Sequence, residues 1–188
     1  KTAIVEKYNT LGGTCLNVGC IPSKALLDSS EHYHNASHTF KEHGIDLKDL
    51  KVNFKQMIER KRGVVSQTCA GIDFLMKKNK IDIINGFGKI KTGKKVDVTA
   101  EDGTLTEYSA DNIIIATGAR SRELPNLPQD GVKVIGYRKA MTLPSQPKSM
   151  IVVGSGAIGV EFAHFYNAMG TEVTIVEYMP NVVPVEDI

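Results

Sequence analysis

Two cysteines lie close together near the start of this chain, and they are the residues best suited to redox chemistry. Cys15 and Cys20 fall in the segment LGGTCLNVGCIPSKALL, residues 11–27. On a regular helix, residues five apart have Cα atoms about 8.6 Å from one another, which exceeds the limit of roughly 7 Å for a disulfide. A disulfide between them therefore requires a distorted backbone. Glycines provide such freedom, and the segment contains Gly12, Gly13 and Gly19.

The second cysteine is expected at or just before the N-terminus of a helix. Pro22 suits the first turn of a helix, and the residues from Ser23 to Leu27 continue it. There the helix dipole and the nearby Lys24 favour a thiolate at Cys20. The spacing alone leaves three hypotheses open: redox chemistry, a structural disulfide and half of a metal site. The third lacks ligands, because the other cysteine, Cys69, stands alone and no histidine lies near the pair in the sequence.

A dinucleotide-binding motif is expected near the other end of the chain. Residues 154–159 are GSGAIG, which matches G-x-G-x-x-G. A short buried strand is predicted before the motif at Met150 to Val153, and a helix after it from Val160 to Met169, where Gly170 ends it. This order of strand, turn and helix is the context in which the motif binds nucleotides. The alternative interpretation of GSGAIG is a glycine turn with a purely structural role.

Each glycine of the motif has a separate physical task. Gly154 makes the tight turn, Gly156 lets the backbone approach a pyrophosphate, and Gly159 permits close packing of the helix on the strand. The N-terminus of the helix then faces the phosphates. Glu177, at the end of the next predicted strand, is placed to accept hydrogen bonds from an adenosine ribose and would repel a 2′-phosphate. The motif therefore predicts NAD rather than NADP.

The strand that ends in Glu177 has a counterpart at the beginning of the chain. Thr2 to Glu6 is TAIVE and Thr171 to Glu177 is TEVTIVE, each a predicted buried strand with a carboxylate at its end. The similarity predicts an internal repeat in which Glu6 binds a first nucleotide, with an exposed carboxylate at a strand end as the alternative. A βαβ unit takes about thirty residues, so we expect the chain to begin about that far into a domain.

Helices and short strands are predicted between the two nucleotide segments. The helix that follows Cys20 is expected to end near Gly44, and a second helix to run from Phe54 to Lys78, by the spacing of their apolar residues. Residues 121–148 have no long periodic stretch and are expected to connect two nucleotide domains. Short strands are predicted at Ile81–Asn85, Lys89–Lys91, Lys95–Ala100, Thr104–Ser109 and, buried, Asn112–Thr117, the third and fourth being joined as a hairpin.

Composition and charge argue against several function classes. The chain has 188 residues, of which 41% are hydrophobic, and 23 basic and 21 acidic residues are spread along it. This balance argues against a nucleic-acid or membrane-surface partner, and the apolar runs are far too short to span a bilayer. Three cysteines, an odd number, suit the reducing cytoplasm. Four histidines lie close together in the sequence, at His32, His34, His38 and His43. No metal site is predicted there, because their spacing places no carboxylate or cysteine ligands on the same face.

The segment GGTCLNVGCIPSK, residues 12–24, resembles the active-site signature of the flavoprotein disulfide reductases, and ALLDSSEHYH, which follows it, resembles the dihydrolipoamide dehydrogenases within that family. The resemblance implies a redox-active disulfide in which Cys15 is the interchange thiol and Cys20 faces the flavin. It also implies that Lys24 lies near the flavin and pairs with a glutamate that matches Glu161. An ordinary salt bridge without a direct catalytic role is the alternative interpretation of Glu161. The implied reaction is oxidation of protein-bound dihydrolipoamide by NAD through the disulfide and FAD.

The fold that the resemblance implies is α/β, with a doubly wound, Rossmann-like FAD domain interrupted by an inserted NAD domain. It assigns residues 1–120 to the FAD domain without its first βα unit, 121–148 to the connection and 149–188 to the start of a truncated NAD domain. The implied FAD positions are Glu6, Gly13, Thr14, Lys24, Gly88, Thr117 and Gly118. The implied NAD positions are Gly154, Gly156, Gly159 and Glu177.

The implied partners are lipoyl domains of 2-oxo acid dehydrogenase complexes or of the glycine cleavage system, and the implied assembly is a homodimer. The family's general base is a histidine from a C-terminal domain of the partner subunit. None of the five histidines of this chain fits that motif, so we expect the chain alone to be inactive. Glutathione reductase, which uses NADP, and mercuric reductase are alternatives that Glu177 and ALLDSSEHYH argue against. A non-catalytic nucleotide-binding or docking module with structural cysteines is an alternative of another class.

Overall fold

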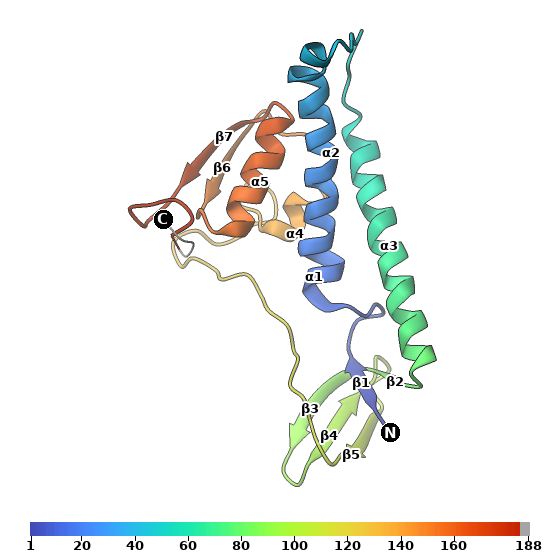
Figure 1. The fold of residues 1–188 in the computed structure, drawn as a ribbon. Coiled ribbons are helices and arrows are strands. Elements are labelled where there is room, and N and C mark those ends of the chain that lie inside the picture. Colours follow the sequence, from blue (N-terminus) through green and yellow to red (C-terminus); the bar gives the residue numbers. More distant parts are fainter. Residues whose placement is uncertain (185–188) are drawn as a thin grey trace. The chain divides into compact units, whose positions relative to one another are not determined.

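The computed structural model describes residues 1–184 (Figure 1). These residues group into two compact units, which are described separately. The first unit holds Lys1–Asn17 and Ser66–Arg120, and the second holds Val18–Val65 and the residues from Ser121 onward. Within the described residues, no helix is long and apolar enough to cross a membrane.

The first unit is built on two small sheets. In one, β1 (Ala3–Glu6) pairs in parallel with β2 (Asp82–Asn85). In the other, β3 (Phe87–Lys91), β4 (Lys95–Thr99) and β5 (Leu105–Ser109) form an antiparallel sheet in that order. The predicted hairpin is confirmed, because the last two of these strands pair in antiparallel fashion across a short turn.

The buried strand predicted at Asn112–Thr117 is wrong, because this segment forms no strand in the described part of the chain. Ile114 and Ile115 are 91% and 71% exposed, and neither sheet of the unit includes the segment. Side chains such as isoleucine favour a strand where neighbouring strands supply a surface to pack on and partners for the backbone groups. Neither sheet supplies them here.

A break at Gly19 separates two helices in the cysteine segment. The helix α1 (Gly13–Val18) contains Cys15, and α2 (Cys20–His38) begins with Cys20 itself. The backbone of Gly19 has φ −132° and ψ −118°, outside the helical region. The distorted backbone and the helix start that the sequence predicts are therefore both confirmed.

The two longer helices also agree with the apolar spacing. After α2, the short 3₁₀ helix η1 (Phe40–His43) ends at Gly44, whose φ of +74° stops the helical path. The helix α3 (Phe54–Lys78) has the bounds that the sequence predicts. Its residues up to Val65 belong to the second unit and those from Ser66 to the first.

The core of the second unit lies where α5 (Ala157–Ala168) packs against α2. The unit also contains α4 (Tyr137–Ala140), β6 (Ser149–Val153) and β7 (Glu172–Val176). Burial of each large apolar side chain contributes roughly 1.5–3 kcal/mol, so this cluster fixes how the helices meet. The buried cluster consists of Leu26, Ile58, Ala140, Met141, Phe162, Phe165, Tyr166 and Met169.

The parallel pair β6 and β7 is covered on one face, so the prediction that these strands are buried is wrong. Ile151 and Val153 are 69% and 52% exposed, whereas Met150 packs against the core cluster. Alternate side chains of a strand point to opposite faces of a sheet, and α5 covers the face that carries Met150. The other predicted buried strand, β1, is likewise only half-buried, with Ala3 exposed.

The compact units do not follow the predicted domain boundaries. Residues 18–65 pack with the region from Ser121 onward, because α2 and part of α3 contribute to the core around α5. The sequence assigns residues 18–65 to a different domain from residues 149–188. That assignment concerns the whole protein, and it stays a prediction.

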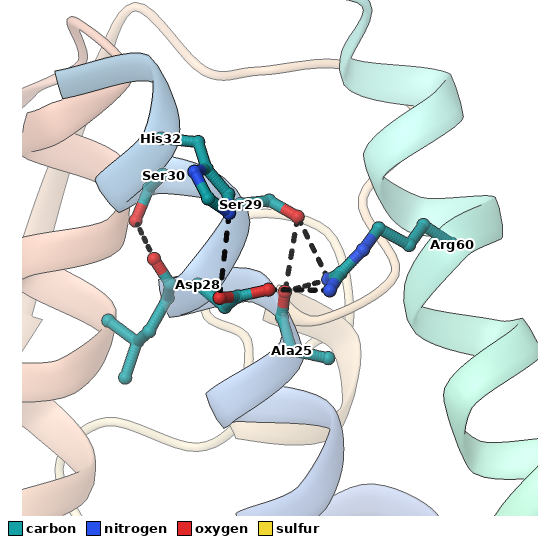
Figure 2. A network of polar contacts seen from close by, with 7 residues as sticks. Ala25, Asp28, Ser29, Ser30, His32 and Arg60 are labelled. Carbon is teal, nitrogen blue, oxygen red and sulfur yellow. Dashed lines mark hydrogen bonds and ion pairs between the residues drawn. The ribbon is translucent and has the colours of Figure 1, made fainter. Parts of the chain in front are cut away.

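A polar network on the exposed side of the second unit joins α2 to α3 (Figure 2). Arg60 Nη1 donates to Ala25 O at 2.8 Å and to Ser29 Oγ at 3.1 Å, while Nη2 forms an ion pair with Asp28 Oδ2. His32 lies on the other side of the same carboxylate, 3.8 Å from Asp28 Oδ1. The guanidinium therefore fixes one helix against the other through a backbone carbonyl as well as through charge.

Replacement of Arg60 by methionine, which keeps the aliphatic stem, is expected to lower the free energy of unfolding by about 1 kcal/mol. The matched control is Arg62→Met on the same helix. Arg62 pairs with Glu59 on the exposed surface, and such pairs contribute roughly 0.5 kcal/mol or less. Urea titration of both variants measures the difference, and equal losses would contradict the role given to Arg60.

Candidate functional site

The N-terminal parts of α2 and α5 bring the side chains of Ser23, Lys24 and Glu161 together in the second unit. Cys20 is the first residue of α2 and is an exposed thiol. One turn later, Lys24 Nζ forms an ion pair with Glu161 Oε1, and Ser23 Oγ lies 3.1 Å from Glu161 Oε2. The structure therefore brings together the predicted pair Lys24 and Glu161, and it adds Ser23, which lies in the signature segment but has no predicted role.

The two partners of this ion pair differ in their exposure to solvent. The side chain of Lys24 is 60% exposed and that of Glu161 is 28% exposed. The backbone at Glu161 is held by the core, because the next residue, Phe162, is buried in the cluster. The ammonium of Lys24 reaches the carboxylate on a flexible stem.

The turn between β6 and α5 has the geometry that G-x-G-x-x-G predicts. Gly154 has φ +100°, a conformation that side chains disfavour. A Cβ at Gly159 would lie 2.1 Å from Gly154 O, so the helix approaches the turn more closely than any other residue allows. A Cβ at Gly156 would meet no atom within 4 Å. The face of the turn at Gly156, where α5 begins, is therefore open.

The carboxylate of Glu177, just after β7, is hydrogen-bonded to this turn. Glu177 Oε2 accepts hydrogen bonds from the backbone N–H and the hydroxyl of Ser155, each at 2.7 Å, and Oε1 accepts one from the N–H of Met179 at 2.9 Å. The bonds from Met179 and then from Ser155 lower the pKa of Glu177 to about 2. The side chain is therefore a fixed negative charge beside the glycine turn at neutral pH.

Ser155 is a further residue that the motif alone does not reveal. It is fully buried, and its hydroxyl also accepts the N–H of Val183 at 3.1 Å. The middle residue of the turn is thus bonded both to the end of β7 and to the segment after it. In the sequence it occupies a variable position of the motif, so no spacing signal could have indicated it.

The predicted flavin positions of the first unit lie on different elements. Glu6 ends β1, and its Oε1 accepts the N–H of Tyr8 at 3.0 Å. Gly88 on β3 packs against β1, since a Cβ there would lie 3.1 Å from Val5 Cγ1. The neighbour of Gly88 is thus a side chain of β1, and a role of Gly88 in FAD binding stays a prediction.

Two other predicted flavin positions meet at the start of α1. A Cβ at Gly118, where φ is +76°, would lie 3.7 Å from Thr14 Oγ1. Gly13 begins α1 with φ +60° and has open space where a Cβ would be. Thr117 precedes Gly118 on the extended segment. The structure therefore groups Gly13, Thr14 and Gly118 near Cys15 of the same unit.

Asn17, which lies in the signature segment but has no predicted role, holds the loop before α1 through hydrogen bonds. Asn17 Nδ2 donates to Leu11 O and to Gly13 O, each at 3.0 Å. Cys69 on α3 donates its thiol to Asn17 Oδ1 at 3.4 Å. Cys69 is half-buried and hydrogen-bonded. Burial, with a smaller effect from Asp73, raises the pKa of the Cys69 thiol.

Among residues 1–184, no group of three or more histidine, cysteine, aspartate or glutamate side chains is arranged to hold a metal ion. His34 and His38 stack on each other along α2, with ring centroids 4.3 Å apart.

A parallel β6–α5–β7 unit with this glycine turn defines a dinucleotide-binding protein, and the cysteine pair beside a helix start adds thiol chemistry. The family model of the pyridine nucleotide-disulphide oxidoreductases matches residues 1–187, and the chain belongs to this family. Its fold is the Rossmann-like α/β fold of these proteins.

Similar proteins include two curated relatives and one solved structure. The chain is 46% identical to a dihydrolipoyl dehydrogenase of Chlorobaculum parvum and 44% identical to a leghemoglobin reductase of Vigna unguiculata, in both cases over all of its length. It spans 39% and 36% of these relatives. The crystal structure of LpdA from Mycobacterium tuberculosis matches 96% of this chain and 39% of its own, with a TM-score of 0.87 and 26% identity.

The close approach at Gly159 generates a stability prediction. Gly159→Ala forces a Cβ into the carbonyl of Gly154, and overpacking of this kind costs about 1–3 kcal/mol. The control is Gly63→Ala in the exposed middle of α3, where a Cβ meets nothing within 4 Å. There alanine is expected to raise the free energy of unfolding by about 0.5–1 kcal/mol. Urea titration distinguishes the two, and a stabilising Gly159→Ala would contradict the observed packing.

The lowered pKa of Glu177 predicts a pH dependence. Because the folded pKa is about 2 and the ordinary value is 4.5, the stability that the ionised carboxylate adds is complete above about pH 5 and lost as the pH falls toward 2. The wild type is therefore expected to be more stable than Glu177→Gln at pH 7, and the gap to narrow steadily between pH 4.5 and 2. Urea titrations across this range measure the gap, and a constant gap would refute the assignment.

Proposed function

We propose that the protein to which these residues belong is an NAD-dependent dihydrolipoamide dehydrogenase. The observation that carries the proposal is the start of α2, where the exposed thiol of Cys20 lies one turn before the Lys24–Glu161 pair. The relative from Chlorobaculum parvum supports the same activity, and its name is that of a dihydrolipoyl dehydrogenase. The chain spans 39% of that relative, so the activity is proposed for the whole protein.

The glycine turn fits NAD. The open face at Gly156 and the start of α5 suit a pyrophosphate, because the N–H groups of a helix N-terminus attract anions. The ionised carboxylate of Glu177 accepts three hydrogen bonds within the protein, and a carboxylate offers about four acceptor positions. It therefore retains capacity for a ribose hydroxyl, and its charge repels a 2′-phosphate. These contacts favour NAD over NADP.

The first unit fits FAD through residues at strand ends and glycine turns. Glu6 would hold the adenosine ribose of FAD, as Glu177 would hold that of NAD. Gly13, Thr14 and Gly118 lie at the start of α1, with open space at Gly13. Gly88 and Thr117 and, from the second unit, Lys24 complete the set that the family resemblance implies. The chemistry that FAD supplies when bound is acceptance of two electrons and delivery of hydride to NAD.

The cysteines would carry out thiol–disulfide exchange. One thiolate of dihydrolipoamide attacks the sulfur of Cys15, and the Cys15–Cys20 disulfide breaks to release Cys20 as a thiolate. The second substrate thiol then displaces Cys15, so that lipoamide leaves as a disulfide and both cysteines are reduced. The exposed positions of both sulfurs suit this exchange. Lys24, one turn after Cys20, would supply a fixed positive charge near the thiolate.

The wider setting of the proposed enzyme follows from the family resemblance. The proposed partners are lipoyl domains of 2-oxo acid dehydrogenase complexes or of the glycine cleavage system, and the proposed assembly is a homodimer. The three cysteines favour the cytoplasm as its location. The proton acceptor would come from the partner subunit, so residues 1–188 alone are expected to be inactive.

The assay compares dihydrolipoamide plus NAD with oxidised glutathione plus NADPH, using the full-length protein loaded with flavin. We expect turnover with the first pair, and a loss of at least about a hundredfold in Cys20→Ser, because serine provides no exchangeable sulfur. The control is Cys69→Ser, which keeps a hydrogen-bond donor to Asn17 and is expected to retain activity. Faster turnover with glutathione and NADPH, or equal losses in both variants, would refute the proposal.

A further inference from the structure

The hydroxyl of Ser23 has two acceptors at the same distance. Ser23 Oγ lies 3.1 Å from Glu161 Oε2 and 3.1 Å from Cys20 O. The other oxygen of the carboxylate, Oε1, forms the ion pair with Lys24. A hydroxyl has one proton to donate, so Ser23 serves either the carboxylate of α5 or the first carbonyl of α2 at any moment.

The carboxylate is the preferred acceptor. Hydrogen bonds to ionised groups are roughly twice as strong as those between neutral groups. The carbonyl of the first helical residue accepts an N–H within the helix, so it does not depend on the hydroxyl. Glu161 is 28% exposed, and water therefore replaces a lost partner only in part. The balance directs the proton of Ser23 to Glu161.

Ser23 holds the carboxylate of Glu161 with a more rigid side chain than Lys24 does. Lys24 is 60% exposed, and an exposed ion pair contributes little and restricts a long side chain. Serine has a single side-chain torsion, and Ser23 is attached to the first turn of a helix. The short side chain therefore fixes the direction of the carboxylate, and the lysine follows it.

The geometry points to Ser23 as a positioning residue that orients Glu161 on Lys24 and ties this pair to the turn that carries Cys20. The inference deepens the proposed function and rests on it only for the catalytic readout. The structural part concerns Ser23, Lys24 and Glu161 alone. It can therefore be tested without any assumption about the substrate.

The test uses the flavin-loaded, full-length protein and a double-mutant cycle between Ser23→Ala and Glu161→Ala. The first readout is the rate at which Lys24 is acylated by a succinimidyl ester, followed by peptide mass mapping, with Lys95 as internal standard. Lys95 pairs with Glu107 in the first unit, so its acylation rate depends on the activity of the reagent and not on Ser23. The second readout is kcat and KM for dihydrolipoamide. The matched control is Ser37→Ala, because the Ser37 hydroxyl donates only to a helical carbonyl, Tyr33 O.

Ser23→Ala is expected to raise the acylation rate of Lys24 about fivefold and to lower kcat by a similar factor, with KM changed by less than about twofold. Ser23→Thr keeps the hydroxyl and is expected to restore both values. In the Glu161→Ala background, Ser23→Ala is expected to change neither readout. Ser37→Ala is expected to match the wild type throughout.

A merely structural role for Ser23 gives a different pattern. Effects of Ser23→Ala that add fully to those of Glu161→Ala, or that equal those of Ser37→Ala, would overturn the inference. If the protein lacks dihydrolipoamide turnover but Lys24 acylation shows the coupling, the inference stands and the proposed function fails. If turnover is present without the coupling, the proposed function stands and the inference fails.

Discussion

The packing of α5 on α2 is the interaction on which the polar site of the second unit depends. Leu26 comes from α2 and Phe162 and Phe165 come from α5, and all three are buried in one cluster. The hydroxyl of the neighbouring Tyr166 donates to Ala140 O at 2.6 Å, which satisfies the polar group that this core buries. Apolar contacts thus set the register of the helices, and Lys24 and Glu161 meet because the N-terminal parts of α2 and α5 are held side by side.

The glutamates at the ends of the strands β1 and β7 make the same local hydrogen bond. Glu6 and Glu177 each accept the N–H of the residue two positions later, at 3.0 Å and 2.9 Å. Both carboxylates lie at the carboxyl end of a strand in a parallel pair, and ligands of such sheets bind at this edge. Only Glu177 has a further donor in Ser155, and this additional bonding accompanies its lowered pKa.

Local signals in the sequence were sufficient for the three longer helices, α2, α3 and α5, and for the hairpin, whereas the short helices α1 and α4 were not predicted. The bounds of α3 follow from apolar spacing, and the break at Gly19 follows from the demands of the cysteine pair. Burial of β6 and of residues 112–117 could not be predicted, because it depends on which neighbours cover a strand. Ser23 and Asn17 escaped detection for a related reason: each acts through a contact formed only when the chain folds.

The different surroundings of the cysteines explain which sulfurs suit exchange. Cys69 is half-buried on α3 and donates its thiol to Asn17, and its raised pKa keeps it protonated. Cys15 and Cys20 are exposed, one on the short helix α1 and the other at the first position of α2. A helix N-terminus stabilises negative charge, so the helix that begins at Cys20 favours departure of this sulfur as a thiolate. The break at Gly19 therefore also creates the helix start at Cys20, on which the proposed difference in role between the two sulfurs rests.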